Sequence, residues 1–293
     1  MNKKNILLIF GFGYTAKFMC QKFSKKNWEV FCTTRFKEKA KEIKSLNATP
    51  VFFDDEEKIE SILSKNSYIL STAPPENGKD PVIENYGYLF KKNSERIEWA
   101  GYLSTTSVYG DKKGGWVTED TVLEPNLERS ISRVAAEKSW LRFGENFSIK
   151  TMIFRLAGIY GPGRSLIDRL IANERVYIVN KPAHLFNRIH VDDIAGAIEM
   201  AISSQSKAKV FNLSDDLPAT QLEVAQFAAS LLKKSCPQTV SLESDLVSEM
   251  ARSFYKEEKK VSNKRLKDEL GYKLAFPSFK EGLSAIHKSS KGF

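Results

Sequence analysis

The stretch Ile6-Leu7-Leu8-Ile9-Phe10-Gly11-Phe12-Gly13-Tyr14-Thr15-Ala16 decides the fold. Its first five residues form an apolar run bounded by glycine, which is typical of a buried strand. A helical spacing of apolar residues then continues through Phe23. The junction between strand and helix reads G-x-G-x-x-A. A strand that passes through a glycine turn directly into a helix predicts the start of a βαβ unit.

The glycine turn has the residue types that a phosphate-binding turn requires. Gly11 allows the tight turn, Gly13 lets a ligand approach the backbone, and the small Ala16 lets the helix pack closely on the strand. Tyr14 and Thr15 begin the helix, whose free N–H groups attract an anion. The alternative is an ordinary strand-to-helix turn. The glycine turn lies at the start of a βαβ series, and this position favours dinucleotide binding over the alternative.

Apolar runs of strand length alternate with helix-length segments through the first half of the chain. The expected strands are 6–10, 30–32, 51–53, 68–70, 101–103 and 149–155. The expected helices run to residue 23 and over 37–46, 59–63, 83–92 and 130–143. This alternation predicts an α/β fold with a doubly wound parallel sheet of the Rossmann type. We expect a dinucleotide-binding domain over 1–160 and a smaller, interleaved substrate domain over 161–293.

Composition narrows the class of protein. The chain has 293 residues and is 42% apolar, so it can bury a core and is not a disordered chain. No segment approaches the roughly 20 apolar residues that span a bilayer. Three cysteines and three histidines are too few for a disulfide framework or a His-based metal site. We therefore expect a cytoplasmic protein without a metal and without a membrane partner.

The formal charge of +9 is concentrated near the N-terminus, where residues 1–50 hold 11 Lys/Arg against 3 Asp/Glu. A basic region can indicate nucleic-acid binding. However, most of these lysines fall on expected surface helices with no interleaved aromatic residues, which favours a solvated face. They are Lys22, Lys25, Lys26, Lys39, Lys41 and Lys44. We expect no nucleic-acid partner.

The segment 33–37 (TTRFK) follows the second strand, where the cofactor is selected. An acid there would bind the ribose 2′-OH of NAD, whereas an arginine accommodates the 2′-phosphate of NADP. The segment contains Thr34 and Arg35 but no acid. NADP is therefore favoured over NAD, with Arg35 as the 2′-phosphate ligand. The alternative is that Arg35 and Lys37 only solvate the start of the next helix.

Two further loops follow strands of the predicted sheet. Asp54 ends the third strand and is expected either to contact the adenine or to cap the next helix. Thr72, Ala73 and Pro74 follow the fourth strand and are small enough for the backbone to pass a cofactor. Ligands of such sheets bind at the carboxyl ends of the strands.

Five motifs occur in the order found in one family: 103–110 (LSTTSVYG), 154–163 (FRLAGIYGPG), 189–195 (IHVDDIA), 211–213 (FNL) and 261–272 (VSNKRLKDELGY). On these motifs the chain resembles the extended short-chain dehydrogenase/reductases, the NAD(P)-dependent epimerase/dehydratase group. The resemblance extends from about Asn5 to Gly282.

The resemblance implies a catalytic hydroxyl, a tyrosine and a lysine, and the last two are missing. Thr105 matches the hydroxyl. The Tyr-x-x-x-Lys positions hold Arg129 and Arg133. A guanidinium stays protonated at physiological pH and is a poor base. The chain therefore resembles an atypical branch, in which we expect Thr105 to bind the substrate and the two arginines to bind an anionic substrate group or the cofactor ribose.

The resemblance also implies a substrate region in the second half. Family members that act on nucleotide sugars carry an arginine where this chain has Phe186, so a nucleotide-sugar substrate is disfavoured. Arg188 lies close by and is the alternative to the missing arginine. Arg129, Arg133 and Arg164 are further candidate anion ligands, although a solvated helix start and a solvated loop explain them equally well. Tyr109 and Tyr160 are expected to rim the site.

Three other features have simpler interpretations. The polar insertion 111–128 is expected to act as a lid. His190 is tempting as an acid or base, but packing or hydrogen bonding is favoured. Asp192 is expected to cap the following helix.

The leading hypothesis is an NADP-preferring oxidoreductase or epimerase-like enzyme. Its substrate would be a small carbonyl or alcohol, anionic or derived from a sugar. The alternative is a catalytically silent NADP(H)-binding sensor or scaffold protein, and a nucleic-acid-binding protein is a weaker third. A homodimer is left open.

Overall fold

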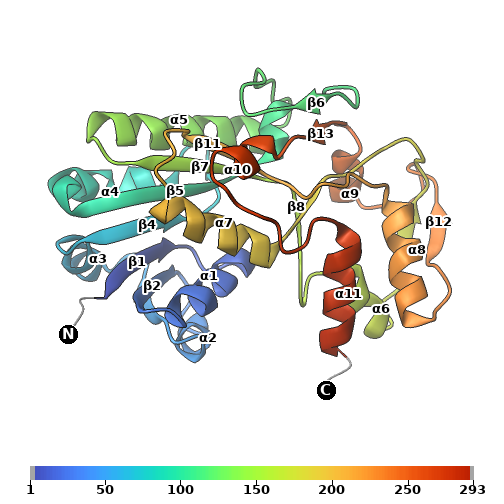
Figure 1. Ribbon diagram of the computed structural model, residues 1–293, viewed down its shortest axis with the longest axis horizontal. Coiled ribbons are helices and arrows are strands. Elements are labelled where there is room, and N and C mark those ends of the chain that lie inside the picture. Colours follow the sequence, from blue (N-terminus) through green and yellow to red (C-terminus); the bar gives the residue numbers. More distant parts are fainter. Residues whose placement is uncertain (1–3, 291–293) are drawn as a thin grey trace. The chain divides into compact units, whose positions relative to one another are not determined.

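The computed structural model describes residues 4–290, and its central feature is a seven-stranded sheet (Figure 1). The strand order is β11-β7-β5-β4-β1-β2-β3. The pairs β1–β2, β1–β4, β2–β3 and β4–β5 are parallel. The bounds are β1 Asn5–Phe10, β2 Trp28–Thr34, β3 Thr49–Phe52, β4 Ser67–Ser71, β5 Ile97–Thr105, β7 Thr151–Leu156 and β11 Val210–Leu213. The predicted doubly wound parallel sheet is confirmed.

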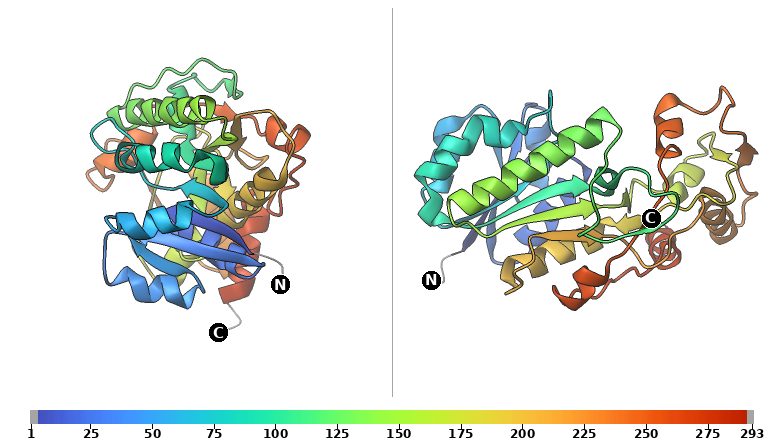
Figure 2. Two further views of the ribbon diagram at one scale, coloured as in Figure 1. Left: turned by 90° about the vertical axis from the view of Figure 1, so that its left-hand side faces the viewer. Right: turned by 90° about the horizontal axis from the view of Figure 1, so that it is seen from above.

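Helices cover both faces of the sheet. Alternate residues of β1 point to opposite sides, and Ile6, Leu8 and Phe10 share a core with α3, α4 and α5. Figure 2 shows α4 and α5 side by side over this face, and Figure 1 places α1 and α7 on the other. The bounds are α1 Tyr14–Ser24, α2 Lys39–Ser45, α3 Glu56–Leu63, α4 Pro81–Lys92, α5 Glu128–Asn146 and α7 Val191–Ser203.

Acidic side chains start two of these helices. The Asp80 carboxylate accepts hydrogen bonds from the N–H groups of Val82 and Ile83, and proline occupies the first turn of α4. Asp55 caps α3 by accepting from the N–H of Lys58. Asp54 was the residue expected to contact the adenine or to form this cap. The expectation of a cap at Asp54 is wrong, because the chain enters the helix one residue later.

The remaining elements are mostly short, and three helices among them share a core. α6, α8 and α11 bury a separate apolar core that includes Ile167, Val224 and Leu283. Three two-stranded pairings accompany it, β10–β8, β12–β9 and β13–β6. The bounds are β6 Trp116–Val117, β8 Gly158–Tyr160, α6 Leu166–Ile171, β9 Tyr177–Val179, β10 Arg188–His190, α8 Gln221–Leu232, β12 Gln238–Val240, α9 Glu249–Phe254, β13 Lys260–Val261, α10 Lys264–Asp268 and α11 Phe279–Ser290.

The chain forms two compact units that interleave along the sequence. The first, called the sheet unit, comprises 1–105, 127–155 and 195–211. The second, called the C-terminal unit, comprises 106–126, 156–194 and 212–293. The predicted domain boundary after residue 160 stays a prediction. None of the helices within residues 4–290 is long and apolar enough to cross a membrane.

Candidate functional site

The glycine turn between β1 and α1 has a backbone that only glycine adopts readily. Gly11 has φ +94°, in the region that L side chains avoid. A Cβ atom there would lie 2.9 Å from the Thr72 hydroxyl oxygen and 3.3 Å from the Ala73 nitrogen. The turn is therefore packed directly against the loop that follows β4. This explains why the first glycine of the motif is required by the fold itself.

Gly13, the second glycine of the turn, lies in open space. It is the N-cap residue of α1, no side chain caps this helix end, and its first turn contains no acidic residue. A Cβ atom at Gly13 would meet nothing within 4 Å. Thr15 and Ala16 are buried against the sheet. The helix therefore presents its positive end at an open backbone position, which is the arrangement that binds a phosphate group.

Threonine hydroxyls hold this turn in place. The Thr33 hydroxyl accepts a hydrogen bond from the Gly11 N–H at 2.9 Å. The Thr72 hydroxyl lies 3.1 Å from the carbonyl oxygens of both Phe10 and Gly11, to which it donates. The predicted ligand Thr34 is buried and accepts from the Phe36 N–H at 3.1 Å. Sequence reasoning missed Thr33, because its role depends on the register between β1 and β2.

Arg35 follows β2 directly, as expected, and its guanidinium is already engaged. It forms an ion pair with Glu76, with Nη1 2.6 Å from Oε1, and it lies over the ring of Phe53. Asp54 and Pro74 are exposed, and Ala73 is half-buried. These residues all belong to the sheet unit.

The three residues expected to take part in catalysis lie near the start of α5 and the end of β5. Thr105 is the last residue of β5 and is half-buried, and Arg129 is exposed in the first turn of α5. Arg133 Nη1 donates to the Tyr102 hydroxyl at 2.8 Å and to the Leu103 carbonyl at 2.9 Å. Burial raises the pKa of Tyr102, although Arg133 opposes the shift. Arg133 therefore bonds to β5, and it cannot serve as a base.

A buried ion pair lies beside these residues. The Glu137 carboxylate on α5 accepts hydrogen bonds from Arg155 on β7, with Nη2 to Oε2 at 2.8 Å. It also accepts from the Ser104 hydroxyl at 2.5 Å. Both charged side chains are almost inaccessible, at 6% for Arg155 and 3% for Glu137. This group fastens α5 to β5 and β7, and no local sequence pattern indicated it.

The predicted substrate residues of the C-terminal unit are mostly buried. Tyr109 is fully buried and donates its hydroxyl to Asn212 at 2.6 Å. Tyr160 is 8% exposed and bonds to the Ser278 carbonyl, and burial raises its pKa. Both hydroxyls are thus used inside the unit, and the expectation that these two tyrosines rim the site stays a prediction.

The two predicted anion ligands of the same unit differ from each other. Arg188 is buried and donates from Nη1 to the carbonyls of Phe186 and Ala219, both at 3.0 Å. Its guanidinium therefore supports the backbone of its own unit. Arg164 is exposed in a turn that precedes α6. Of the two arginines, only Arg164 has an exposed side chain that can reach an anionic ligand.

Other ionisable groups of the C-terminal unit are also buried. Burial raises the pKa of Asp215 to about 7, and Arg188 opposes the shift. Burial likewise lowers the pKa of His190 to about 4, and its Nδ1 accepts from the Asp192 N–H. Asp193 accepts from the N–H groups of Ala275 and Phe276 and anchors the chain before α11. The expectation that Asp192 caps α7 is wrong, since it lies inside the first turn of the helix.

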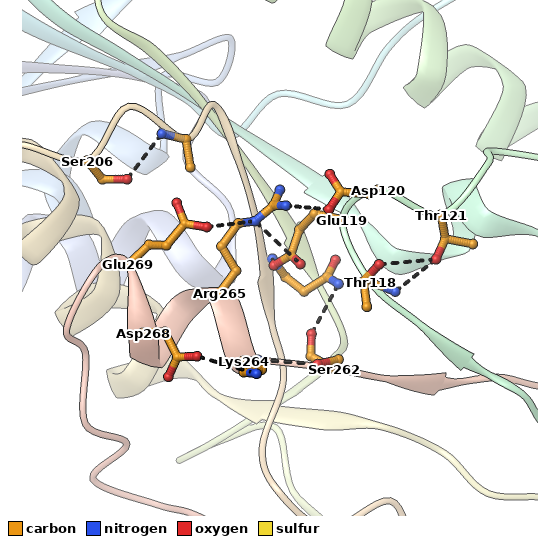
Figure 3. Close-up of polar contacts among 12 residues, drawn as sticks. Thr118, Glu119, Asp120, Thr121, Ser206, Ser262, Lys264, Arg265, Asp268 and Glu269 are labelled. Carbon is orange, nitrogen blue, oxygen red and sulfur yellow. Dashed lines mark hydrogen bonds and ion pairs between the residues drawn. The ribbon is translucent and has the colours of Figure 1, made fainter.

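The insertion expected to be a lid is fastened at several points (Figure 3). Its strand β6 pairs with β13. Arg265 on α10 forms ion pairs with Asp120 at 2.6 Å and with Glu119 at 3.9 Å. Glu119 also accepts from the Asn212 N–H at 2.8 Å. The insertion is therefore an integral part of the C-terminal unit, and its role as a lid stays a prediction.

A pocket of about 430 Å³ is present elsewhere in the sheet unit. Its lining includes residues 148–152 and 206–209, which precede β7 and β11. It therefore lies at the amino ends of these strands, whereas the glycine turn follows the carboxyl end of β1. Lys150 donates there to carbonyls at the end of α7, and Lys209 pairs with Glu145. Two of its lysines are thus already partnered, and we do not assign the pocket to the reaction.

Metal-binding side chains do not form a cluster within the described residues. Among residues 4–290, no group of three His, Cys, Asp or Glu side chains is placed to hold a metal ion. The site is therefore defined by backbone, hydroxyl and guanidinium groups.

The sheet order and the glycine turn at the carboxyl end of β1 define a dinucleotide-binding fold of the Rossmann class. A family model described as the NAD-dependent epimerase/dehydratase family matches residues 7–214. The chain belongs to this family.

Known proteins resemble the chain over nearly its whole length. A conserved protein of unknown function from Silicibacter pomeroyi is 35% identical with a TM-score of 0.90, covering 98% of this chain and 99% of that one. UDP-glucuronic acid 4-epimerase from Bacillus cereus, solved with NAD, is 20% identical with a TM-score of 0.74 over 98% and 99% of the two chains. A sterol-4-alpha-carboxylate 3-dehydrogenase (decarboxylating) from Dictyostelium discoideum is 23% identical, covering 86% of this chain and 82% of its own.

Proposed function

We propose that the protein binds NADP(H) at the glycine turn and is an oxidoreductase or epimerase-like enzyme acting on a small carbonyl or alcohol. The observation that carries this proposal is the open backbone at Gly13, where a Cβ atom would meet nothing within 4 Å, at the uncapped start of α1. A pyrophosphate needs such a backbone. The epimerase of similar fold that was solved with NAD supports a nicotinamide dinucleotide as the ligand.

The preference for NADP rests on the end of β2. The segment 33–37 contains no acidic residue to bind a ribose 2′-OH, and its Arg35 supplies a guanidinium that suits a phosphate. The nicotinamide ring would supply hydride transfer, so the protein has to orient the substrate. Thr105 is the hydroxyl proposed to hydrogen-bond the substrate.

Two exposed arginines and the names of two relatives support an anionic substrate. Arg129 and Arg164 are exposed arginines, and arginine binds carboxylates in a two-pronged geometry. The names of two relatives contain an acid, a sterol carboxylate in one and glucuronic acid in the other. We propose a carboxylate-bearing or sugar-derived substrate on this basis.

A catalytically silent NADP(H)-binding protein is the second candidate, and one observation favours it. The lysine position of the family holds Arg133, whose guanidinium donates to Tyr102 and Leu103. A guanidinium donates hydrogen bonds but is a poor base. The proton relay of the family is thus replaced by groups that can bind and orient but cannot act as bases.

One series of measurements distinguishes the enzyme from the catalytically silent protein. Fluorescence titration should give tighter binding for NADPH than for NADH, and Gly13→Ala should weaken both while leaving the melting temperature unchanged. NADPH oxidation is then followed over carbonyl substrates with and without a carboxylate, with Thr105→Val as the comparison variant. Binding without turnover over the whole panel would support the silent protein. Absence of binding to either cofactor would refute both candidates.

A further inference from the structure

The guanidinium of Arg35 is held on two sides. Its Nη1 lies 2.6 Å from Glu76 Oε1 and its Nη2 lies 3.4 Å from Oε2, so the contact is two-pronged. Its Cζ lies 4.9 Å from the centre of the Phe53 ring. Both charged side chains remain about half exposed, at 48% for Arg35 and 49% for Glu76. The pair is thus ordered by its geometry and is still accessible to a competing anion.

A tight turn presents Glu76 to Arg35. The Glu76 N–H donates to the Lys79 carbonyl at 2.9 Å, and the Lys79 N–H donates back to the Glu76 carbonyl at 3.0 Å. Asn77 and Gly78 have positive φ values of 50° and 77°, the backbone of a two-residue hairpin turn. The Lys79 side chain pairs with Glu84. The carboxylate of Glu76 is therefore directed across to the end of β2, 41 residues away in sequence.

We propose that Glu76 is a specificity-determining residue, which lowers the preference for NADP over NAD by competing with the 2′-phosphate for Arg35. This inference rests on the proposed dinucleotide function. A 2′-phosphate needs the same guanidinium that the carboxylate holds, and two anions cannot share it without repulsion. A ribose 2′-OH carries no charge and is not repelled.

The consequence is a graded selectivity. Arg35 alone would favour NADP strongly, and the neighbouring carboxylate reduces that advantage. Because Arg35 and Glu76 are half exposed, the competition weakens as salt screens it. Removal of the carboxylate should therefore act on NADP(H) and leave NAD(H) almost unchanged.

The test compares dissociation constants of NADPH and NADH for the wild-type protein and four variants. Glu76→Gln removes the charge with nearly the same shape, and we expect about tenfold tighter NADPH binding with NADH changed less than twofold. Glu84→Gln is the matched control, since Glu84 also sits in an exposed ion pair close by in sequence, and both constants should stay within twofold. Arg35→Gln should weaken NADPH alone. In an Arg35→Gln background, Glu76→Gln should no longer tighten NADPH binding.

Two results would overturn the inference, and they differ from each other. If Glu76→Gln changes NADPH and NADH binding by the same factor, or changes neither of them, Glu76 has no part in selectivity. The proposed cofactor site is not affected by that result. If neither the wild type nor any variant binds a dinucleotide, the proposed function fails and this inference fails with it. Melting temperatures of all variants should agree with the wild type, because the altered side chains are exposed.

Discussion

Replacing Glu137 by Gln would leave the guanidinium of Arg155 as an unbalanced charge inside the sheet unit. In the wild type, Arg155 bonds to both carboxylate oxygens, at 3.1 Å and 3.2 Å from Nε and at 2.8 Å from Nη2. The glutamine keeps the shape and one acceptor for Ser104, so packing hardly changes. The variant therefore measures the loss of charge balance with little contribution from a cavity.

The expected cost follows from burial. The two side chains are 6% and 3% exposed, so water cannot replace the lost partner. Removing one member of such a pair costs about 3–5 kcal/mol. A protein of ordinary stability has only about 5–15 kcal/mol in total. At about 2.1 cal/mol/K of unfolding entropy per residue, a chain of 293 residues has about 0.6 kcal/mol/K, so the loss corresponds to a fall of about 5–8 °C in the melting temperature.

Urea denaturation followed by circular dichroism measures the free energy of unfolding. The matched control is Glu145→Gln on the same helix, where the pair with Lys209 is exposed at 60% and 53%, and we expect no measurable change there. The double variant Glu137→Gln/Arg155→Met should recover part of the loss, since it no longer buries a lone charge. If Glu137→Gln costs less than about 1 kcal/mol, the interpretation of this group as a structural anchor is refuted.

Three further predictions concern the turn, the buried acid and the insertion. Gly11→Ala should lower both the melting temperature and dinucleotide affinity, whereas Gly13→Ala should lower affinity alone; equal effects on stability would contradict the clash at Gly11. Asp215 keeps its proton up to about pH 7 in the folded protein and loses it near 3.8 when unfolded, so its contribution to stability falls as pH rises between these values. The melting temperature of Asp215→Asn relative to wild type should therefore increase from pH 5 to pH 8, and a flat difference would count against the raised pKa. Arg265→Met should expose the insertion 111–128 to limited proteolysis before the rest of the chain, unlike Lys264→Met, which alters the exposed neighbouring residue.

The sheet was predictable because local patterns encode it. The apolar run before Gly11 and the later runs of the same kind become strands of one sheet, and the helices between them differ from prediction by a few residues at their ends. Alternation of strand and helix leaves few topologies open. The glycine turn was predictable for the same reason, since its chemistry lies in six consecutive residues.

The contacts that the sequence analysis missed are those between distant segments. Thr33 supports Gly11 only because β1 and β2 pair in one register. Glu76 faces Arg35 through a turn whose direction no local pattern indicates. Tyr109 is followed by glycine in a polar region and reads as a loop residue, yet its hydroxyl bonds to Asn212 in the interior. Side-chain roles of this kind depend on three-dimensional proximity.

The fastening of the insertion by Arg265 has a consequence for the order in which the chain can fold. Asp120 and Arg265 are 145 residues apart, so the insertion has left the ribosome long before its partner exists. At about 5–20 residues per second, the delay is roughly 7–30 s. During synthesis the strands of the sheet through β7 can already pair. The strand β6 of the insertion cannot pair until its partner β13 has been made. The last tenth of the chain thus completes a structure that begins near its middle, and a truncated product would present the insertion to proteases.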